Sequence, residues 1–222
     1  EENRILEMRG IEKSFPGVRA LRGVDFSLKK GEIHALMGEN GAGKSTLIKV
    51  LTGVYSKDSG TISMPGAEDI QIHSPQDAQN TGIATVYQEI TLCPNLTVAE
   101  NMYIGRTSGP LTNWKKMNAS AGKLLDELGI PASPTEQLGN CSIAVQQMVA
   151  IARAVDMECK VLILDEPTSS LDESEVQKLF GLMRDLKSKG VGIIFVTHFL
   201  DHVYEVCDKI TVLRDGKLVG EY

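Results

Sequence analysis

The sequence lacks long apolar runs and clusters of positive charge. No apolar stretch has the length that crossing a bilayer requires, and no run of Lys or Arg exceeds two residues. The formal net charge of −6 argues against an electrostatic surface for nucleic acid or for an anionic membrane. The N-terminus has no apolar region of a signal peptide. With 222 residues, of which 42% are hydrophobic, the chain can bury the core of one soluble globular domain.

Cysteine is also scarce and scattered. Cys93, Cys141, Cys159 and Cys207 lie far apart and form no C-x-x-C pair, so a disulfide framework is not expected. Reduced thiols in a cytosolic protein are the simpler interpretation. The sequence does not begin with Met, which leaves open that it is a fragment of a longer protein.

A glycine-rich segment, residues 38–46, is the most informative feature that is present. It fits the pattern G-x-x-x-x-G-K-[ST] and lies between an apolar strand pattern and apolar residues at helical spacing. Glycines let backbone N–H groups turn toward phosphate oxygens, and the start of the following helix favours the same anion. An unrelated Gly-rich turn is the alternative, but it does not account for this context. The segment predicts a nucleotide site made by Gly38, Asn40, Gly41, Ala42, Gly43, Lys44, Ser45 and Thr46.

Two side chains of this segment have specific expected roles. Lys44 is expected to reach the β- and γ-phosphates of a nucleoside triphosphate, and the Ser45 hydroxyl to bind Mg²⁺. ATP and Mg²⁺ are therefore the expected ligands.

Apolar patterns elsewhere indicate an α/β fold. Continuous apolar runs at residues 161–164 and 193–196 suit strands buried on both faces of a mostly parallel sheet. Asp215 and Gly216 lie between two further strand patterns and predict a hairpin. The middle of the chain shows helical spacing and no long strand pattern, which predicts a helical insertion.

Two acidic residues follow the apolar run at residues 161–164. A carboxylate at the C-terminal end of a buried parallel strand points into the crevice where ligands bind. Asp165 is expected to hold Mg²⁺, and Glu166 to polarise the attacking water as general base. The alternative is an acidic pair at a helix start, with Pro167 at the turn. The glycine-rich segment in the same chain favours the first hypothesis.

Two further polar residues follow strand patterns. His198 can donate to a γ-phosphate or to its transition state. A zinc pair with His202 is the alternative, but Phe199 occupies the position where a zinc hydrolase would carry Glu, and no third ligand is evident. Gln88 can bind Mg²⁺ or orient water through its amide, although a Gln in such a position is usually only solvated.

Together these elements resemble the nucleotide-binding domain of an ATP-binding cassette (ABC) transporter over the whole chain. The resemblance implies a RecA-like P-loop NTPase core at residues 1–88 and 160–222, with an antiparallel β subdomain, and a helical subdomain at residues 89–159. The residue roles that it implies are adenine stacking by Phe15, the Q-loop at Gln88, the Walker B pair Asp165 and Glu166, the D-loop with Asp172, and the switch histidine His198.

Longer stretches, residues 15–21, 34–55, 82–105 and 210–220, resemble the ATPase subunits of bacterial monosaccharide importers of the ribose and galactose type. In that family two cassettes are fused in one polypeptide, and this chain resembles the N-terminal one. The resemblance implies a second cassette and membrane permease subunits as partners, a sugar-binding protein as an indirect partner, and a peripheral place on the cytoplasmic face of the membrane. A soluble ABC ATPase of ribosomes or DNA repair, or a regulatory nucleotide-binding module, is the alternative.

One motif departs from the family. The family signature is close to Leu-Ser-Gly-Gly-Gln, whereas residues 141–145 are Cys-Ser-Ile-Ala-Val. Ser142 keeps a hydroxyl at a helix start, but Ala144 adds a methyl group where close phosphate approach favours Gly, and Val145 loses a polar side chain. In this family two cassettes sandwich two nucleotides, and each signature completes its partner's site. The resemblance therefore implies an asymmetric pair, in which the site on this chain's own Walker motifs hydrolyses ATP better.

Overall fold

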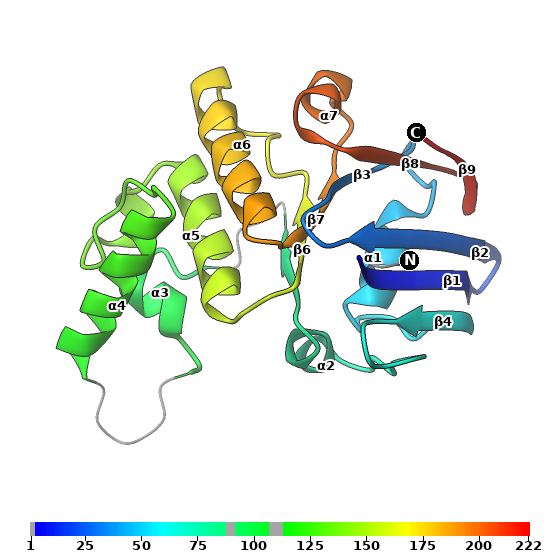
Figure 1. The fold of residues 1–222 in the computed structure, drawn as a ribbon, viewed down its shortest axis with the longest axis horizontal. Helices are drawn as coiled ribbons and strands as arrows, with labels where there is room; N and C mark the ends of the chain where they lie inside the picture. The colour runs from blue at the N-terminus through cyan, green and yellow to red at the C-terminus, as the bar shows by residue number, and fades with distance from the viewer. Residues whose placement is uncertain (1–2, 88–91, 107–112) are drawn as a thin grey trace. The chain divides into compact units, whose positions relative to one another are not determined.

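Two β-sheets organise the structure, a computed structural model that describes residues 3–87, 92–106 and 113–222 (Figure 1). Within these residues, one sheet has the strand order β5-β6-β7-β3-β8-β9 and the other the order β2-β1-β4. The strands of the larger sheet are β5 (Ile83–Val86), β6 (Val161–Asp165), β7 (Gly192–Val196), β3 (Ile33–Met37), β8 (Lys209–Arg214) and β9 (Lys217–Glu221). Those of the smaller sheet are β2 (Val18–Lys29), β1 (Arg4–Phe15) and β4 (Ser59–Ser63). The helices are α1 (Lys44–Leu51), α2 (Pro75–Asn80), α3 (Val98–Tyr103), α4 (Trp114–Glu127), α5 (Ile143–Asp156), α6 (Glu173–Ser188) and α7 (Leu200–Val206), with a 3₁₀ turn η1 (Leu138–Asn140).

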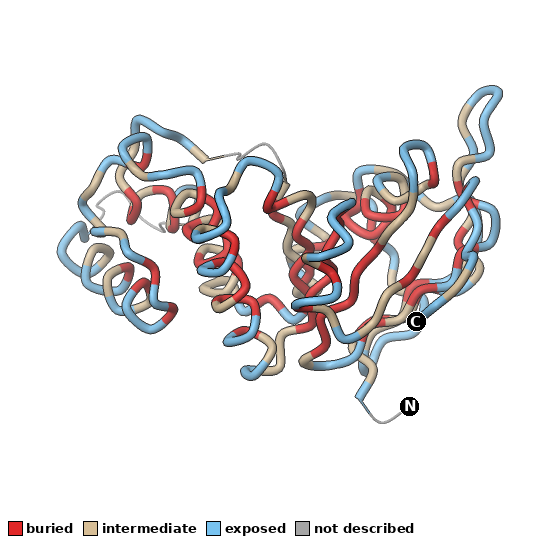
Figure 2. The backbone as a smooth tube through the Cα atoms, turned by 90° about the horizontal axis from the view of Figure 1, so that it is seen from above, coloured by how far each residue is buried: buried red, intermediate tan, exposed pale blue. Residues whose placement is uncertain are grey.

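The centre of the larger sheet is parallel. β3 pairs in parallel with β7 on one side and with β8 on the other, and β6 pairs in parallel with β7. Each of β3, β6 and β7 has at least four consecutive buried residues, as expected for strands covered on both faces (Figure 2). Because these strands are parallel, their C-terminal ends meet at one edge of the sheet. The predicted α/β fold with a mostly parallel sheet is confirmed.

The predicted hairpin near the end of the sequence is also present. β8 and β9 pair antiparallel, and the two residues between them, Asp215 and Gly216, have φ of 50° and 75°. Positive φ at both central residues is the requirement of the tight hairpin turn whose twist matches that of the strands.

The smaller sheet is antiparallel, as the resemblance implied, but its strands are longer than the sequence pattern. The alternating pattern at residues 24–28 lies within β2, which begins at Val18 and places Val24, Phe26 and Leu28 in the core. β2 pairs with β1 over most of its length, through four register shifts. Pairing with β1 therefore extends β2 beyond the segment that alternates.

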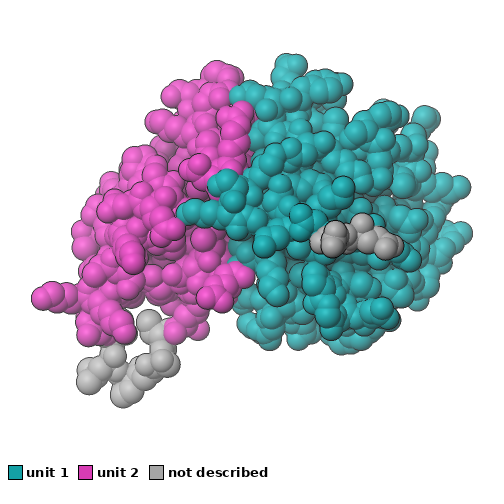
Figure 3. Space-filling view, viewed as in Figure 1, with its two compact units in different colours: residues 1–85, 159–166, 186–222 teal, residues 86–158, 167–185 magenta. Residues whose placement is uncertain are grey.

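The chain forms two compact units, coloured separately in Figure 3. Unit 1 comprises residues 1–85, 159–166 and 186–222, and unit 2 comprises residues 86–158 and 167–185. The described helices of unit 2 are α3, α4, α5 and most of α6, consistent with a helical insertion. The subdomain boundaries proposed from the sequence, 1–88 with 160–222 and 89–159, stay a prediction. Among the described helices, none combines the length and the apolar character that spanning a membrane demands.

Candidate functional site

The loop between β3 and α1 carries the predicted phosphate-binding residues, and its path requires glycine. Gly38, Gly41 and Gly43 have φ of 153°, 83° and 107°, a region that other residues rarely adopt. A Cβ atom at Gly38 would lie 2.4 Å from the carbonyl oxygen of Leu213 in β8. A Cβ atom at Gly43 would lie 3.0 Å from the carbonyl oxygen of Ala20 in β2. The loop backbone therefore runs directly against two neighbouring strands.

The turn between β8 and β9 holds this loop in place. The Gly216 N–H donates to the Ala42 carbonyl at 3.0 Å, and the Gly216 carbonyl accepts from the Arg22 N–H at 2.8 Å. Ala42 is itself buried, 4% exposed. One glycine thus connects the loop to β2 through backbone hydrogen bonds. The sequence predicted the hairpin and the loop separately, and nothing local in it indicated that they touch.

The start of α1 has the properties of an anion site. Gly43 is the N-cap residue of α1, and no side chain caps this helix end. The first N–H groups of a helix have no partner within the helix, and they carry its positive end. The Lys44 ammonium donates to the carbonyls of Gly38 and Glu39, the latter at 3.2 Å, so its charge lies over the loop. Ser45 follows in the first turn and is exposed.

A cavity of about 550 Å³ opens beside the loop. This volume is in the range of small-molecule sites. Its wall brings together the predicted Phe15 and all the predicted loop residues except Gly38. The lining residues are Phe15, Val18, Arg19, Ala20, Arg22, residues 39–46, Asp215 and Gly216. Sequence reasoning assigned no site role to the cationic Arg19 and Arg22, because both are distant from the loop in sequence; Arg19 entered it only within the stretch of residues 15–21 that resembles sugar importers.

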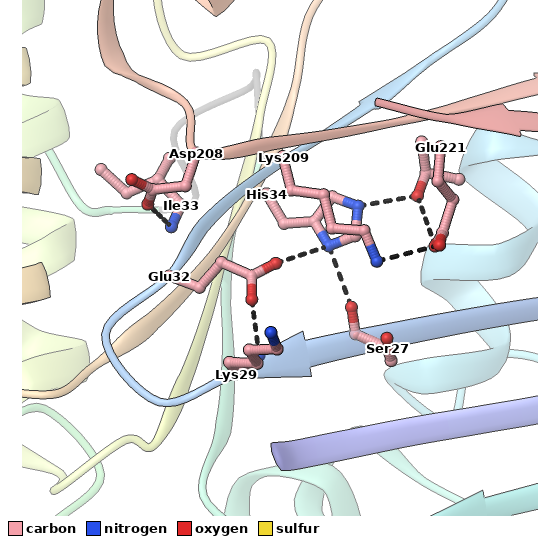
Figure 4. A network of polar contacts seen from close by, with 9 residues as sticks. Ser27, Lys29, Glu32, Ile33, His34, Asp208, Lys209 and Glu221 are labelled. Atoms are coloured by element: carbon pink, nitrogen blue, oxygen red, sulfur yellow. Dashed lines mark hydrogen bonds and ion pairs between the residues drawn. The ribbon is translucent and has the colours of Figure 1, made fainter. Parts of the chain in front are cut away.

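A buried polar network supports β3, the strand that leads into the loop (Figure 4). The His34 ring contacts the Ser27 carbonyl through Nδ1 at 2.9 Å and the Thr211 hydroxyl through Nε2 at 2.7 Å. The Glu32 carboxylate lies 3.1 Å from the same Nδ1 atom. Burial raises the pKa of the Glu32 carboxyl, but the hydrogen bond and charge of His34, together with the Lys29 N–H and the charge of Lys209, more than offset it, so this pKa lies below its ordinary value. The network ties β3 to β2 and β8.

Glu166 and His198 meet at the C-terminal edge of the larger sheet. Glu166 follows β6 with a φ of 49°, and its N–H donates to the Val196 carbonyl of β7 at 2.8 Å. His198 Nδ1 lies 3.1 Å from Glu166 Oε1 and 3.0 Å from Oε2. A contact with an ionised carboxylate requires a proton on Nδ1. Glu166 and His198, which the sequence singled out separately, are thus in direct contact in the structure.

Asp165, the last residue of β6, is a suitable ligand for a divalent cation. Burial and the negative charge of Glu166 raise the pKa of the Asp165 carboxyl, while Lys44 and Lys49 partly lower it. A cation beside this carboxylate would relieve the cost of keeping it ionised. Carboxylate and hydroxyl oxygens are also the donors that Mg²⁺ prefers, so Asp165 and Ser45 fit this ion. Lys49 was not singled out from the sequence, because helix α1 offers no motif beyond its first turn.

An aromatic ring contacts both members of the histidine pair behind the zinc alternative. The Phe199 ring centroid lies 4.1 Å from that of His198 and 5.0 Å from that of His202. Over residues 3–87, 92–106 and 113–222, no three His, Cys, Asp or Glu side chains gather in a metal-binding arrangement. Gln88, the other predicted Mg²⁺ ligand, lies outside the described residues.

Ser142 and Asp172 belong to unit 2, and each caps a helix. The Ser142 hydroxyl accepts from the Val145 N–H at 3.3 Å, and the Asp172 carboxylate accepts from the Glu175 N–H at 2.9 Å. Ser142 is exposed, whereas Ala144 is only 2% exposed. The methyl group of Ala144 is therefore packed inside the protein and not presented at the surface with the hydroxyl.

The sequence has many relatives among sugar import proteins. The fructose import ATP-binding protein of Bifidobacterium longum is 53% identical, over 100% of this chain and 44% of that protein. The galactofuranose transporter ATP-binding protein of Escherichia coli K12 is 54% identical, over 99% of this chain and 44% of that protein. The ribose import ATP-binding protein of Streptomyces avermitilis is 50% identical, over 98% and 42%. The chain thus spans less than half the length of these relatives.

Solved structures agree with the sequence comparison. A nucleotide-free ATP-binding cassette from an ABC transporter superposes with a TM-score of 0.87 at 29% identity, over 98% of this chain and 90% of that one. Another cassette, in its ADP conformation, gives a TM-score of 0.88 at 28% identity with the same coverage. The sequence profile described as ABC transporter matches residues 21–169. The resemblance noted from the motifs is confirmed, and the chain belongs to the ABC transporter family.

Proposed function

We propose that this chain is the ATP-binding and ATP-hydrolysing cassette of a monosaccharide importer. The observation that carries the proposal is the presence, in unit 1, of the uncapped helix start at the glycine loop and of the Glu166–His198 contact. The import of fructose, galactofuranose or ribose named for the relatives supports a sugar as the cargo.

The cavity beside the loop would bind the nucleotide. Phe15 stacks on adenine, while the loop N–H groups and Lys44 bind the β- and γ-phosphates. Ser45 and Asp165 hold Mg²⁺, together with Gln88. Bound Mg²⁺ supplies positive charge that stabilises the phosphate oxygens during transfer.

Glu166 and His198 would act on the terminal phosphate. The Glu166 carboxylate accepts a proton from the attacking water, and its oxygen atoms are held at 3.0–3.1 Å from His198 Nδ1. The His198 side chain is 63% exposed, so a γ-phosphate can approach its ring when nucleotide binds. This arrangement makes Glu166 the residue whose removal stops turnover without preventing binding.

Partner proteins would complete the transporter. Ser142 and Asp172 face the nucleotide of a second cassette, either a fused C-terminal half or a second copy, and ATP drives closure because its γ-phosphate is contacted from both sides only when closed. The altered signature at residues 141–145 makes ATP hydrolysis slower at the partner's nucleotide site, which it completes, than at the site on this chain's own Walker motifs. Membrane permease subunits receive the motion at the cytoplasmic face, a sugar-binding protein acts indirectly, and nucleic acid is no partner.

The first experiment is light scattering on a sizing column with the Glu166→Gln chain, with and without Mg·ATP. Dimerisation only with ATP supports a nucleotide sandwich that this signature can close. Lys44→Ala is the control, and it should stay monomeric and bind ATP poorly. A Glu166→Gln chain that binds no ATP contradicts the proposal.

Co-purification from membranes decides between the transporter and its alternatives. We expect the tagged chain, expressed with its whole protein, to be recovered with permease subunits in the membrane fraction. Recovery only in the soluble fraction, or with ribosomes, would favour a non-transport ABC ATPase.

If alanine at Ser142 stopped turnover in the assembled complex as completely as Glu166→Gln, the two sites would not be asymmetric.

A further inference from the structure

Phe15 is contacted by two residues that do not line the cavity. Its ring centroid lies 5.0 Å from that of Tyr55, with an angle of 70° between the ring planes, which is an edge-to-face pair. The Lys13 ammonium lies over the Phe15 ring, 5.5 Å from the centroid. Phe15 lines the cavity, whereas neither Tyr55 nor Lys13 does. Both residues therefore support the ring from outside the cavity.

Tyr55 is fixed to α1, the helix that starts at the phosphate loop. Its N–H donates to the Lys49 carbonyl of α1 at 3.0 Å, and the Lys49 ammonium lies 5.3 Å from the centroid of its ring. The Tyr55 side chain also packs against the buried core of unit 1. The edge-to-face contact with Tyr55 thus gives Phe15 a fixed position relative to the loop.

Lys13 is fixed in turn by Asp58. The Lys13 ammonium donates to the Asp58 carboxylate at 3.0 Å, and the other carboxylate oxygen accepts from the Ser14 N–H at 2.6 Å. The hydrogen bond from Lys13 holds the pKa of the Asp58 carboxyl below its ordinary value. The ammonium is therefore held by a carboxylate while its charge lies above the ring, which is the geometry of a cation–π contact.

Phe15 needs such support because of its place in the fold. It is the last residue of β1, followed by the Pro16–Gly17 turn, and its side chain is only partly buried. A base can stack on a mobile ring, but the side chain then loses rotamer entropy on binding, so a ring whose plane is already fixed binds the base more tightly. We infer that Tyr55 and Lys13 are positioning residues for Phe15, holding its ring in the plane on which the base stacks. The inference rests on the proposed function, since it assigns adenine to Phe15.

The test compares a ligand that has a base with one that lacks it. In the Glu166→Gln background, which prevents turnover, calorimetry measures the affinity of each variant for Mg·ATP and for Mg·tripolyphosphate. Phe15→Ala should weaken ATP binding about tenfold or more, the usual effect of losing a stacking platform. Tyr55→Leu should weaken it about threefold to tenfold. Tyr55→Phe, which keeps the ring, should bind ATP as the parent does, and all three variants should bind tripolyphosphate normally.

A double variant separates positioning from general support. If Tyr55 acts through Phe15, then Phe15→Ala combined with Tyr55→Leu should bind ATP no more weakly than Phe15→Ala alone. Lys13→Met keeps most of the length of the side chain without its charge, and it should weaken ATP binding about twofold to fivefold with tripolyphosphate unaffected. This variant carries the test if Tyr55→Leu does not fold.

Three results would overturn the inference: parental ATP affinity in both Tyr55→Leu and Lys13→Met, an equal loss of both ligands, or additive losses in the double variant. An equal loss of both ligands would mean that Tyr55 supports the phosphate loop and not the base. Parental ATP affinity in Phe15→Ala would have a different meaning. It would show that the base does not stack on Phe15, and so contradict the role that the proposed function gives this residue.

Discussion

Gly38 should be the least replaceable position of the phosphate loop, and Gly41 provides a matched control. Both have positive φ, 153° and 83°, so alanine at either position is strained. They differ in the space around them. A Cβ at Gly41 would meet no atom within 4 Å, whereas one at Gly38 would lie 2.4 Å from the Leu213 carbonyl oxygen and 2.8 Å from Ala42 Cβ.

The difference in cost can be worked out from these contacts. A left-handed backbone costs a residue other than glycine about 1–2 kcal/mol, and Gly41→Ala should lose about that much stability. Gly38→Ala bears a comparable cost, and the backbone of β8 or of the loop must also shift, which adds about 1–3 kcal/mol. For a chain of this size, 1 kcal/mol corresponds to about 2–4 °C in Tm. Gly38→Ala should therefore melt about 2–12 °C below Gly41→Ala.

The assay is thermal unfolding of the two variants and the parent chain without nucleotide. Measuring without ATP keeps any loss of ligand binding out of the comparison. If Gly38→Ala and Gly41→Ala melted at the same temperature, the close approach of Gly38 to β8 would not exist in solution.

Three further predictions follow from ionisable groups. The pKa of Asp165 is raised in the folded chain, so the ionised carboxylate destabilises the fold at any pH above the ordinary Asp pKa. Asp165→Asn should therefore raise Tm at pH 7, although ATP turnover is lost. A lower Tm in this variant would contradict the prediction. The lowered pKa of Glu32 stabilises the fold above the ordinary Glu pKa and loses this effect as pH falls through the lowered value. His34→Leu should therefore cost about 1–3 kcal/mol at pH 7 and less at pH 4; a loss independent of pH would refute the pairing. Burial raises the pKa of Cys159 to about 11, so a thiol reagent at pH 8 should modify the exposed Cys93 quickly and Cys159 only after unfolding, as mass spectrometry of the labelled peptides would reveal.

Much of the fold could be predicted because its signals are local. The apolar runs of β6 and β7 and the hairpin residues Asp215 and Gly216 each specify their structure within a few positions. The lengths of β1 and β2 could not be predicted in this way. Gly10 and Gly23 lie inside these strands with φ of 59° and 76°, near shifts in register that break the alternation of apolar and polar residues. Only pairing between the two strands makes them continuous.

In the candidate site, too, the features with local sequence signals could be predicted and those that depend on distant contacts could not. Glu166 and His198 were each singled out from the strand before them, and parallel pairing of β6 with β7 then accounts for their contact. The electrostatic effect of Lys49 on Asp165 arises from packing between distant segments and has no motif. The roles of the individual site residues stay predictions until binding and turnover are measured.

The backbone bonds of Gly216 have a consequence for the order of folding. The loop at residues 38–46 is complete only when a turn near residue 216 has joined it, and β3 is bordered by strands at residues 192–196 and 209–214. During synthesis, the ribosome must therefore release almost all of this sequence before the loop can take its final shape. Contacts so distant in sequence slow folding. A nascent chain that stops before β8 should emerge without nucleotide affinity, although it already contains every residue of the glycine motif.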